Sequence, residues 1–108
     1  MRRIYHLVPR RIWEANPKEP YRAASLVTEG FIHCSNADQV ARSANRFYTD
    51  ETNLLVVAID ADRLGALLKD ESGGAELFPH LYAPLDRSLV LAVRSMQRGD
   101  DGRWTFAE

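Results

Sequence analysis

The chain has 108 residues, of which 45% are hydrophobic and 27% are charged, and its formal net charge is −1. This length is typical of one domain, so we expect residues 1–108 to form a single unit. The near-neutral charge argues against binding of duplex nucleic acid, and no run approaches the roughly 18 apolar residues of a membrane span. Cys34 is the only cysteine, which excludes an internal disulfide bond and indicates a reducing, cytoplasmic setting.

The first half of the chain predicts two strands and two helices. Residues 3–8 alternate as a strand, with Ile4, His6 and Val8 on one face and Tyr5 and Leu7 on the other. The expected elements that follow are a short helix over 10–15 that starts after Pro9, a turn at 28–30, a strand over 31–34, and a helix from 36 or 37 to about 48 that Ser35 would cap.

The second half predicts further strands around one short helix. Residues 54–59 form a continuous aliphatic run that is typical of a central strand. The remaining expectations are a helix over 61–69, extended backbone over 78–82, a strand over 88–96, and a terminal hairpin with its turn at 99–102. The sequence thus predicts an α+β fold, with a mainly antiparallel or mixed sheet of about five or six strands and two or three helices. The predicted core contains Ile4 or Leu7, Phe47, Leu55, Val57, Ile59, Leu91 and Val93.

Three histidines, His6, His33 and His80, each stand alone in a short apolar run that resembles a strand. A buried imidazole must find a hydrogen-bond partner or take part in chemistry, because leaving it unpaired costs about 2 kcal/mol or more. One such residue is ordinary in a protein core. Three in the same context favour a shared cleft, so we expect all three side chains to open onto one site.

A metal centre is one alternative for three histidines, because three imidazoles and a water form a catalytic zinc site. The histidines are separated by 27 and 47 positions, however, and no two of them have the short spacing of paired ligands. Cys34 follows His33 directly, so the two side chains point to opposite faces of a strand. We therefore expect no metal, and a three-histidine metal hydrolase stays as an alternative.

A cleft that binds an anionic ligand is the other interpretation. The basic residues are twelve arginines and two lysines, and the arginine fork suits phosphates and carboxylates. Arg10 and Arg46 lie near the histidine motifs and could offset negative charge. Glu76 precedes His80 by four residues and could supply a carboxylate, or it could be a surface charge.

Four motifs resemble a known bacterial family in their order along the chain. Ile4-Tyr5-His6, Gly30-Phe31-Ile32-His33-Cys34-Ser35, Asn45-Arg46-Phe47 and Phe78-Pro79-His80-Leu81-Tyr82 are similar to the motifs of domain of unknown function 952, from about residue 3 to residue 93. That family in turn resembles the ADP-ribosyltransferase-like fold, in particular RNA 2′-phosphotransferases. Those enzymes place a Tyr-His pair on the first core strand and a histidine on the next, where they contact the ADP-ribose part of NAD.

The resemblance implies that Tyr5-His6 and Ile32-His33 are the corresponding pairs here. Leu7 stands where a glycine usually follows the first histidine, and only Glu76 could serve as the glutamate motif. The implied function is binding of NAD, or of an ADP-ribosyl or phosphorylated nucleotide, and the implied reaction for an enzyme is ADP-ribosyl or phosphoryl transfer. A non-catalytic nucleotide-binding module is a further alternative. The expected catalytic residues are His33, His80 and Glu76, and the expected ligand contacts are Tyr5, His6, Arg10, Ser35, Asn45, Arg46 and Tyr82.

Overall fold

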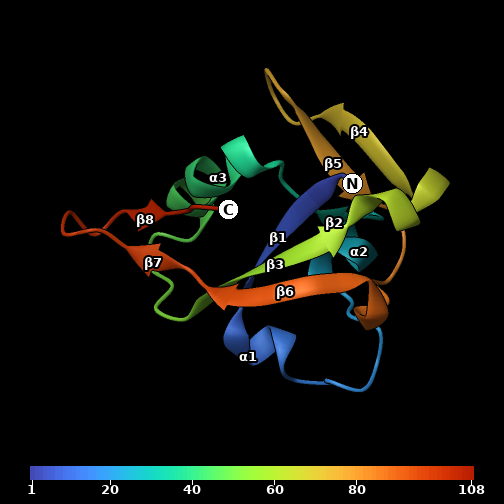
Figure 1. Ribbon diagram of the computed structural model, residues 1–108, viewed down its shortest axis with the longest axis horizontal. Coiled ribbons are helices and arrows are strands. Elements are labelled where there is room, and N and C mark those ends of the chain that lie inside the picture. The colour runs from blue at the N-terminus through green and yellow to red at the C-terminus, as the bar shows by residue number, and fades with distance from the viewer.

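The computed structural model describes residues 1–108, and its largest sheet is antiparallel with the strand order β1-β3-β6 (Figure 1). Strand β3 (Leu54–Asp60) pairs with β1 (Arg3–Pro9) on one side and with β6 (Val90–Ser95) on the other. Residues 54–59 of β3 are all buried, because both faces of this central strand are covered. The prediction of a central strand from this aliphatic run is confirmed.

A second antiparallel sheet has the order β2-β5-β4 and carries two of the three histidines. It consists of β2 (Ile32–His33), β5 (Leu77–Leu81) and β4 (Leu68–Ser72), and β4 and β5 form a projecting hairpin (Figure 1). A third, two-stranded sheet pairs β7 (Gln97–Arg98) with β8 (Trp104–Thr105), as the turn at residues 99–102 predicts.

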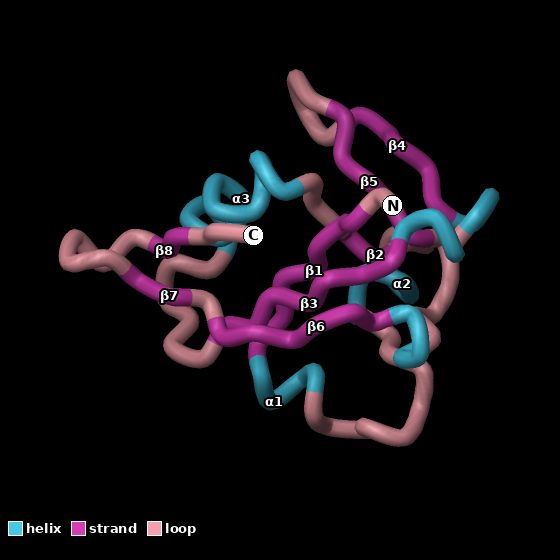
Figure 2. The backbone as a smooth tube through the Cα atoms, in the orientation of Figure 1, coloured by secondary structure: helices cyan, strands magenta, loops and turns pink.

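The helices are short and lie around the strands, as Figure 2 shows. They are α1 (Arg10–Trp13), α2 (Ala24–Thr28) and α3 (Val40–Phe47), with 3₁₀ turns at Ala37–Gln39, Ala61–Arg63, Gly65–Leu67 and Arg87–Leu89. None of the helices is long and apolar enough to cross a membrane. The molecule is thus α+β, with several antiparallel sheets in place of one continuous sheet.

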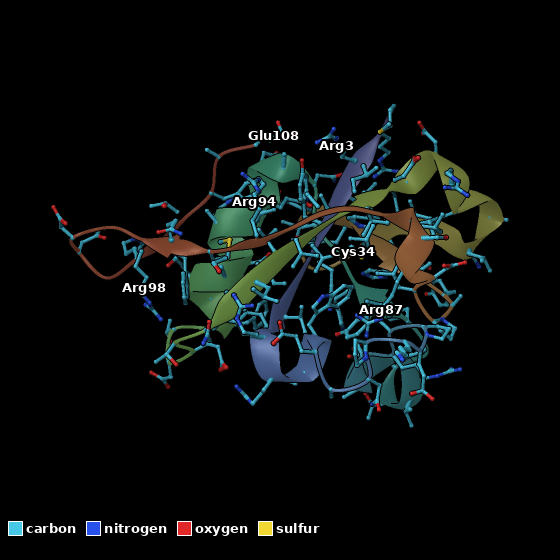
Figure 3. All side chains as sticks on the ribbon, turned by 60° about the horizontal axis from the view of Figure 1, so that its bottom comes forward. Arg3, Cys34, Arg87, Arg94, Arg98 and Glu108 are labelled. Atoms are coloured by element: carbon cyan, nitrogen blue, oxygen red, sulfur yellow. The ribbon has the colours of Figure 1, made fainter.

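The two faces of the large sheet carry separate hydrophobic clusters, which the alternation in β1 makes possible. Ile4 and Val8 pack in one cluster with Val57, and Tyr5 and Leu7 pack in the other. Cys34, also in the first cluster, lies inside the molecule with 4% of its surface exposed (Figure 3). The predicted facing of the first strand is confirmed.

Three predictions about the core are wrong. Leu91 and Val93 are 40% and 42% exposed, because the face of β6 that carries them is left uncovered, unlike the faces of the other edge strand, β1. Phe47 is 68% exposed, because it ends α3 and faces solvent at the mouth of a cleft. Which strand faces and helix ends are covered is a tertiary feature that a periodic sequence pattern does not encode.

Two predicted elements also differ from the structure. Residues 61–69 form two 3₁₀ turns that lead into β4, because Gly65 has φ +57° and interrupts any regular helix. Asn36, and not Ser35, occupies the cap position of the 3₁₀ turn Ala37–Gln39 that leads into α3, and the Gln39 side chain accepts a hydrogen bond from the Asn36 backbone N–H at 2.9 Å. This frees the side chain of Ser35 for another role.

Arg87 fixes the long loop that follows α1 (Figure 3). Its guanidinium donates to the carbonyl oxygens of Trp13, Asn16 and Glu19 at 2.7–3.1 Å, and it lies 4.3 Å from the centre of the Trp13 ring. The loop leads to Tyr21, whose backbone bridges to Leu85. This anchoring places the Tyr21 side chain under the histidine site.

Candidate functional site

A cleft of about 760 Å³ lies between α3, one face of the second sheet and the turn that joins β4 to β5. In Figure 1, α3 and the β4–β5 hairpin are seen on either side of β1, and β5 of that hairpin carries His80. His6, His33 and His80 all line this cleft. The prediction that the three histidines open onto one site is confirmed.

His6 forms part of the floor and both of its ring nitrogens are bonded within the protein. Nδ1 lies 2.6 Å from the carbonyl oxygen of His33, so it carries the proton and donates to that oxygen. Nε2 then accepts from the hydroxyl of Tyr21 at 2.8 Å. Burial lowers the pKa of His6 to about 4 and raises the pKa of Tyr21, so both groups are neutral near pH 7. His6 therefore holds β1 against β2 and has no nitrogen left for a ligand.

His33 and His80 face each other across adjacent strands. They are direct partners in the β2–β5 register, and their ring centres are 5.7 Å apart. The ring of Phe31 stacks on His80 at 4.0 Å with an angle of 13°, and meets His33 edge-on at 4.7 Å. This packing limits the rotation of both imidazoles.

Each of these two histidines has a carboxylate partner that the sequence analysis missed. Glu29 Oε2 lies 2.8 Å from Nε2 of His33, and Glu71 Oε1 lies 3.1 Å from Nδ1 of His80. The hydroxyl of Tyr82 donates to the same Glu71 oxygen. The hydrogen bonds from Tyr82 and His80 lower the pKa of Glu71, and the bond to Glu71 raises the pKa of Tyr82. The four-residue spacing of Glu29 and His33 was a readable signal, whereas Glu71 lies just beyond the helix expected over 61–69, in residues to which the sequence analysis assigned no strand.

Two arginines of α3 line the cleft, and they differ in their partners. Arg42 forms a two-pronged ion pair with Glu76, which lowers the pKa of that carboxyl. Glu76, the predicted catalytic carboxylate, therefore lies at the cleft but is held by Arg42. Arg46 has no carboxylate partner, and its guanidinium lies 5.2 Å from the centre of the neighbouring Phe47 ring.

Ser35 and Phe78 complete the lining. Ser35 is 6% exposed, and its side chain forms no hydrogen bond within the protein. Phe78 lies against the turn of the β4–β5 hairpin, where a Cβ on Gly73 would stand 2.6 Å from the phenyl ring. Gly73 thus leaves room for Phe78 to form one wall of the cleft.

Four predicted ligand contacts lie outside the cleft. The hydroxyl of Tyr5 donates to Glu108 on the opposite face of the large sheet. Arg10 is bonded to Asn53, Glu14 and Ser95. Asn45 joins α3 to the backbone of Trp104 through two hydrogen bonds of 2.7 and 3.0 Å. Tyr82 does not line the cleft, and it is connected to His80 only through the hydrogen bond from its hydroxyl to Glu71. Sequence proximity to a histidine motif did not reveal which face these side chains take.

The donor set does not fit a metal ion. No three histidine, cysteine, aspartate or glutamate side chains are grouped so that they could hold one. Both nitrogens of His6 are occupied, and burial raises the pKa of the Cys34 thiol to about 12, so it is no ready thiolate. The three-histidine hydrolase therefore lacks its third ligand.

Comparison with known proteins identifies relatives in sequence and in structure. The crystal structure of protein CC0527 from Caulobacter crescentus is 33% identical, with a TM-score of 0.86, and the match covers 95% of this chain and 93% of that one. The solution NMR structure of CC0527 is also 33% identical, with a TM-score of 0.82 over 95% and 91% of the two chains. These structures add no support for an ADP-ribosyltransferase-like architecture, and no curated protein matches the chain. The model of a family described as "Protein of unknown function (DUF952)" matches residues 7–93, so the chain belongs to the DUF952 family.

Proposed function

We propose that the cleft binds a nucleotide, with NAD or another ADP-ribosyl or phosphorylated nucleotide as the ligand class. The volume of about 760 Å³ lies within the usual range for small-molecule sites, roughly 300–1,000 Å³. Phe31, Phe47 and Phe78 offer flat apolar surfaces for a base or a nicotinamide ring. The sugar and phosphate groups would meet Ser35, His33 and His80.

The observation that carries this proposal is the position of Arg46 beside an aromatic wall. It is a cation at the mouth of the cleft without a carboxylate partner, which is the arrangement that suits a phosphate. Arg42 has its charge offset by Glu76 and serves less well. The ADP-ribosyltransferase-like relationship would give the same ligand class, and transfer of an ADP-ribosyl or phosphoryl group is the enzymatic form of the proposal.

A non-catalytic nucleotide-binding module uses the same contacts and differs only in turnover. The unpaired nitrogens of His33 and His80, both at the cleft, favour the enzymatic form. A metal-dependent hydrolase is disfavoured, because His6 is committed to the carbonyl of His33 and to Tyr21.

Calorimetric titration of NAD and ADP-ribose tests the proposal. Arg46→Ala should weaken binding by about 1.5–3 kcal/mol, the range for a charge-assisted hydrogen bond. Arg103→Ala is the matched control, since it removes an exposed arginine from the terminal hairpin, outside the cleft. Equal affinities for wild type and Arg46→Ala would remove Arg46 from the site, and no binding of either nucleotide would reject the proposed ligand class.

A further inference from the structure

His33 and His80 differ in exposure although they face each other. The side chain of His33 is 54% exposed, whereas that of His80 is 8% exposed under the Phe31 ring. One imidazole therefore meets bulk water and the other is shielded from it. With ring centres 5.7 Å apart, both rings border the same small part of the cleft.

The carboxylate partners leave one nitrogen of each ring available. Glu29 bonds Nε2 of His33, so Nδ1 is free, and Glu71 bonds Nδ1 of His80, so Nε2 is free. A carboxylate at one nitrogen fixes the orientation and tautomer of an imidazole and stabilises its charged form. Glu71 in turn accepts a hydrogen bond from Tyr82, so two residues, Glu71 and Tyr82, support His80.

We propose that His33 and His80 are a metal-free acid–base pair that hydrolyses the phosphodiester of a phosphorylated nucleotide bound in the cleft, a cyclic nucleotide in particular, with Glu29 and Glu71 as positioning residues. This rests on the proposed nucleotide-binding function of the cleft. Neutral His33 takes a proton from a water molecule as its oxygen attacks phosphorus. The bond from phosphorus to the leaving ribose oxygen breaks, and that oxygen receives a proton from protonated His80. One water is consumed, a phosphomonoester and a hydroxyl form, and solvent returns the two histidines to their starting states.

Phosphodiester cleavage fits this pair better than cleavage of a glycosidic bond. In-line displacement puts the attacking and leaving oxygens on opposite sides of phosphorus, so proton transfer is needed at two separate points. Of two facing imidazoles, one can accept the proton of the attacking water and the other can donate a proton to the leaving oxygen. An oxocarbenium-like transition state instead needs a carboxylate turned toward the sugar. The three carboxylates near the cleft, Glu29, Glu71 and Glu76, are bonded to His33, His80 and Arg42.

Hydrolysis of 2′,3′-cyclic AMP, followed by chromatography of the adenosine monophosphate formed, tests the pair. His33→Gln and His80→Gln should each lower kcat at least about 100-fold, the lower range for general acid or base catalysis, with little change in KM. EDTA should leave the rate unchanged. Because His33 is exposed, His33→Gln is expected to fold even if the buried His80 variant does not, and circular dichroism checks both.

The pH profile separates positioning from structural roles. The charged and titratable groups around the pair are Glu71, Lys69 and Asp70 from β4, Glu29 after α2, Tyr82 after β5, and His6 from β1. One neutral and one protonated histidine are required, so kcat/KM should be bell-shaped in pH. Glu71→Gln should lower kcat and shift one limb of this curve, and Glu71→Asp should partly restore both. An unshifted curve for Glu71→Gln would remove Glu71 from the mechanism.

The outcomes for binding and for catalysis are separable. Nucleotide binding that depends on Arg46, without turnover of 2′,3′-cyclic AMP, would overturn the acid–base pair and leave the binding function standing. Hydrolysis of bis(4-nitrophenyl) phosphate that needs both histidines, without binding of any nucleotide, would support the pair and overturn the nucleotide ligand. Turnover that survives either histidine substitution, or that EDTA abolishes, would overturn the pair.

Discussion

His6 lies between the backbone of β2 and the phenol of Tyr21, and each of its nitrogens has one partner. It is 6% exposed, and its burial outweighs the hydrogen bond to the His33 carbonyl, so its pKa falls to about 4. Protonation would place an uncompensated charge in the core and would break the bond from Tyr21. At the scale of single residues, then, three histidines in similar sequence contexts have different roles: His6 is structural, with both nitrogens bonded within the protein, whereas His33 and His80 each keep one nitrogen without a partner.

This environment predicts acid sensitivity of the fold. Between pH 6.5 and pH 4 the unfolded chain binds a proton at His6 that the folded chain does not, so stability falls as pH falls through this window. Above pH 6.5 His6 is neutral in both the folded and the unfolded chain, and this loss of stability is absent. The shift of its pKa from 6.5 to about 4 corresponds to a loss of about 3 kcal/mol in the free energy of unfolding once the pH has fallen below that window. Urea unfolding of wild type and His6→Gln at pH 7 and pH 4.5 measures it. Wild type should lose about 2–3 kcal/mol more than the variant over this range. Equal losses would mean that His6 is not the group responsible.

At the scale of elements, the start of α3 sets the geometry of one cleft wall. The Gln39 side chain accepts from Asn36 at the cap and also donates to the carbonyl oxygen of Leu77 on β5 at 2.9 Å. The helix is thereby tied to the second sheet at the residue where it begins. Ser35 is left with a free hydroxyl at the cleft, one position before the cap.

A pair of substitutions tests which residue caps the 3₁₀ turn Ala37–Gln39 that leads into α3. Asn36→Ala should destabilise the protein by about 1 kcal/mol, typical for loss of a cap, and it also removes a hydrogen bond from Arg2 at 3.1 Å. Ser35→Ala should change stability by less than about 0.5 kcal/mol, because its hydroxyl has no partner to lose. Urea unfolding at pH 7 measures both. A larger loss for Ser35→Ala than for Asn36→Ala would contradict the assignment.

At the scale of the whole molecule, the cleft exists because two sheets and a helix are held at fixed positions around it. The ion pair of Arg42 with Glu76 and the hydrogen bond from Gln39 to Leu77 connect α3 and the turn before it to the β4–β5 hairpin. The loop that Arg87 anchors (Figure 3) leads to Tyr21, whose hydroxyl donates to His6. The supports of the site thus come from well-separated parts of the chain.

This assembly predicts stabilisation by ligand and indifference to chelators. A structural or catalytic metal contributes to folding free energy, so its removal lowers the melting temperature. With no triad of ligands, EDTA should leave the melting temperature unchanged. NAD or ADP-ribose at 100 times its Kd should add about 2.7 kcal/mol of stability. Thermal unfolding followed by fluorescence measures both effects, with Arg46→Ala at the same ligand concentration as the control. Loss of stability on chelation would restore the metal-hydrolase alternative.

The sequence by itself determined the features that depend on local periodicity. The aliphatic run at residues 54–59 predicted the central strand. The alternation of Ile4, Tyr5 and Leu7 predicted which face of the first strand each side chain takes. The repeated context of the three histidines was enough to predict a shared cleft, because a polar ring inside a strand must face a polar space or a partner.

Only the tertiary structure decided how the site is built. Glu71 contacts His80 because β4 pairs with β5. Tyr21 contacts His6 because Arg87 holds the loop that leads to Tyr21. Leu91 and Val93 are exposed because nothing covers their face of β6, although their sequence pattern matches that of a covered strand. The physical reason is common to all of these. Period and propensity are properties of neighbouring residues, whereas strand order, edges and hydrogen-bond partners between distant segments depend on how the whole chain packs.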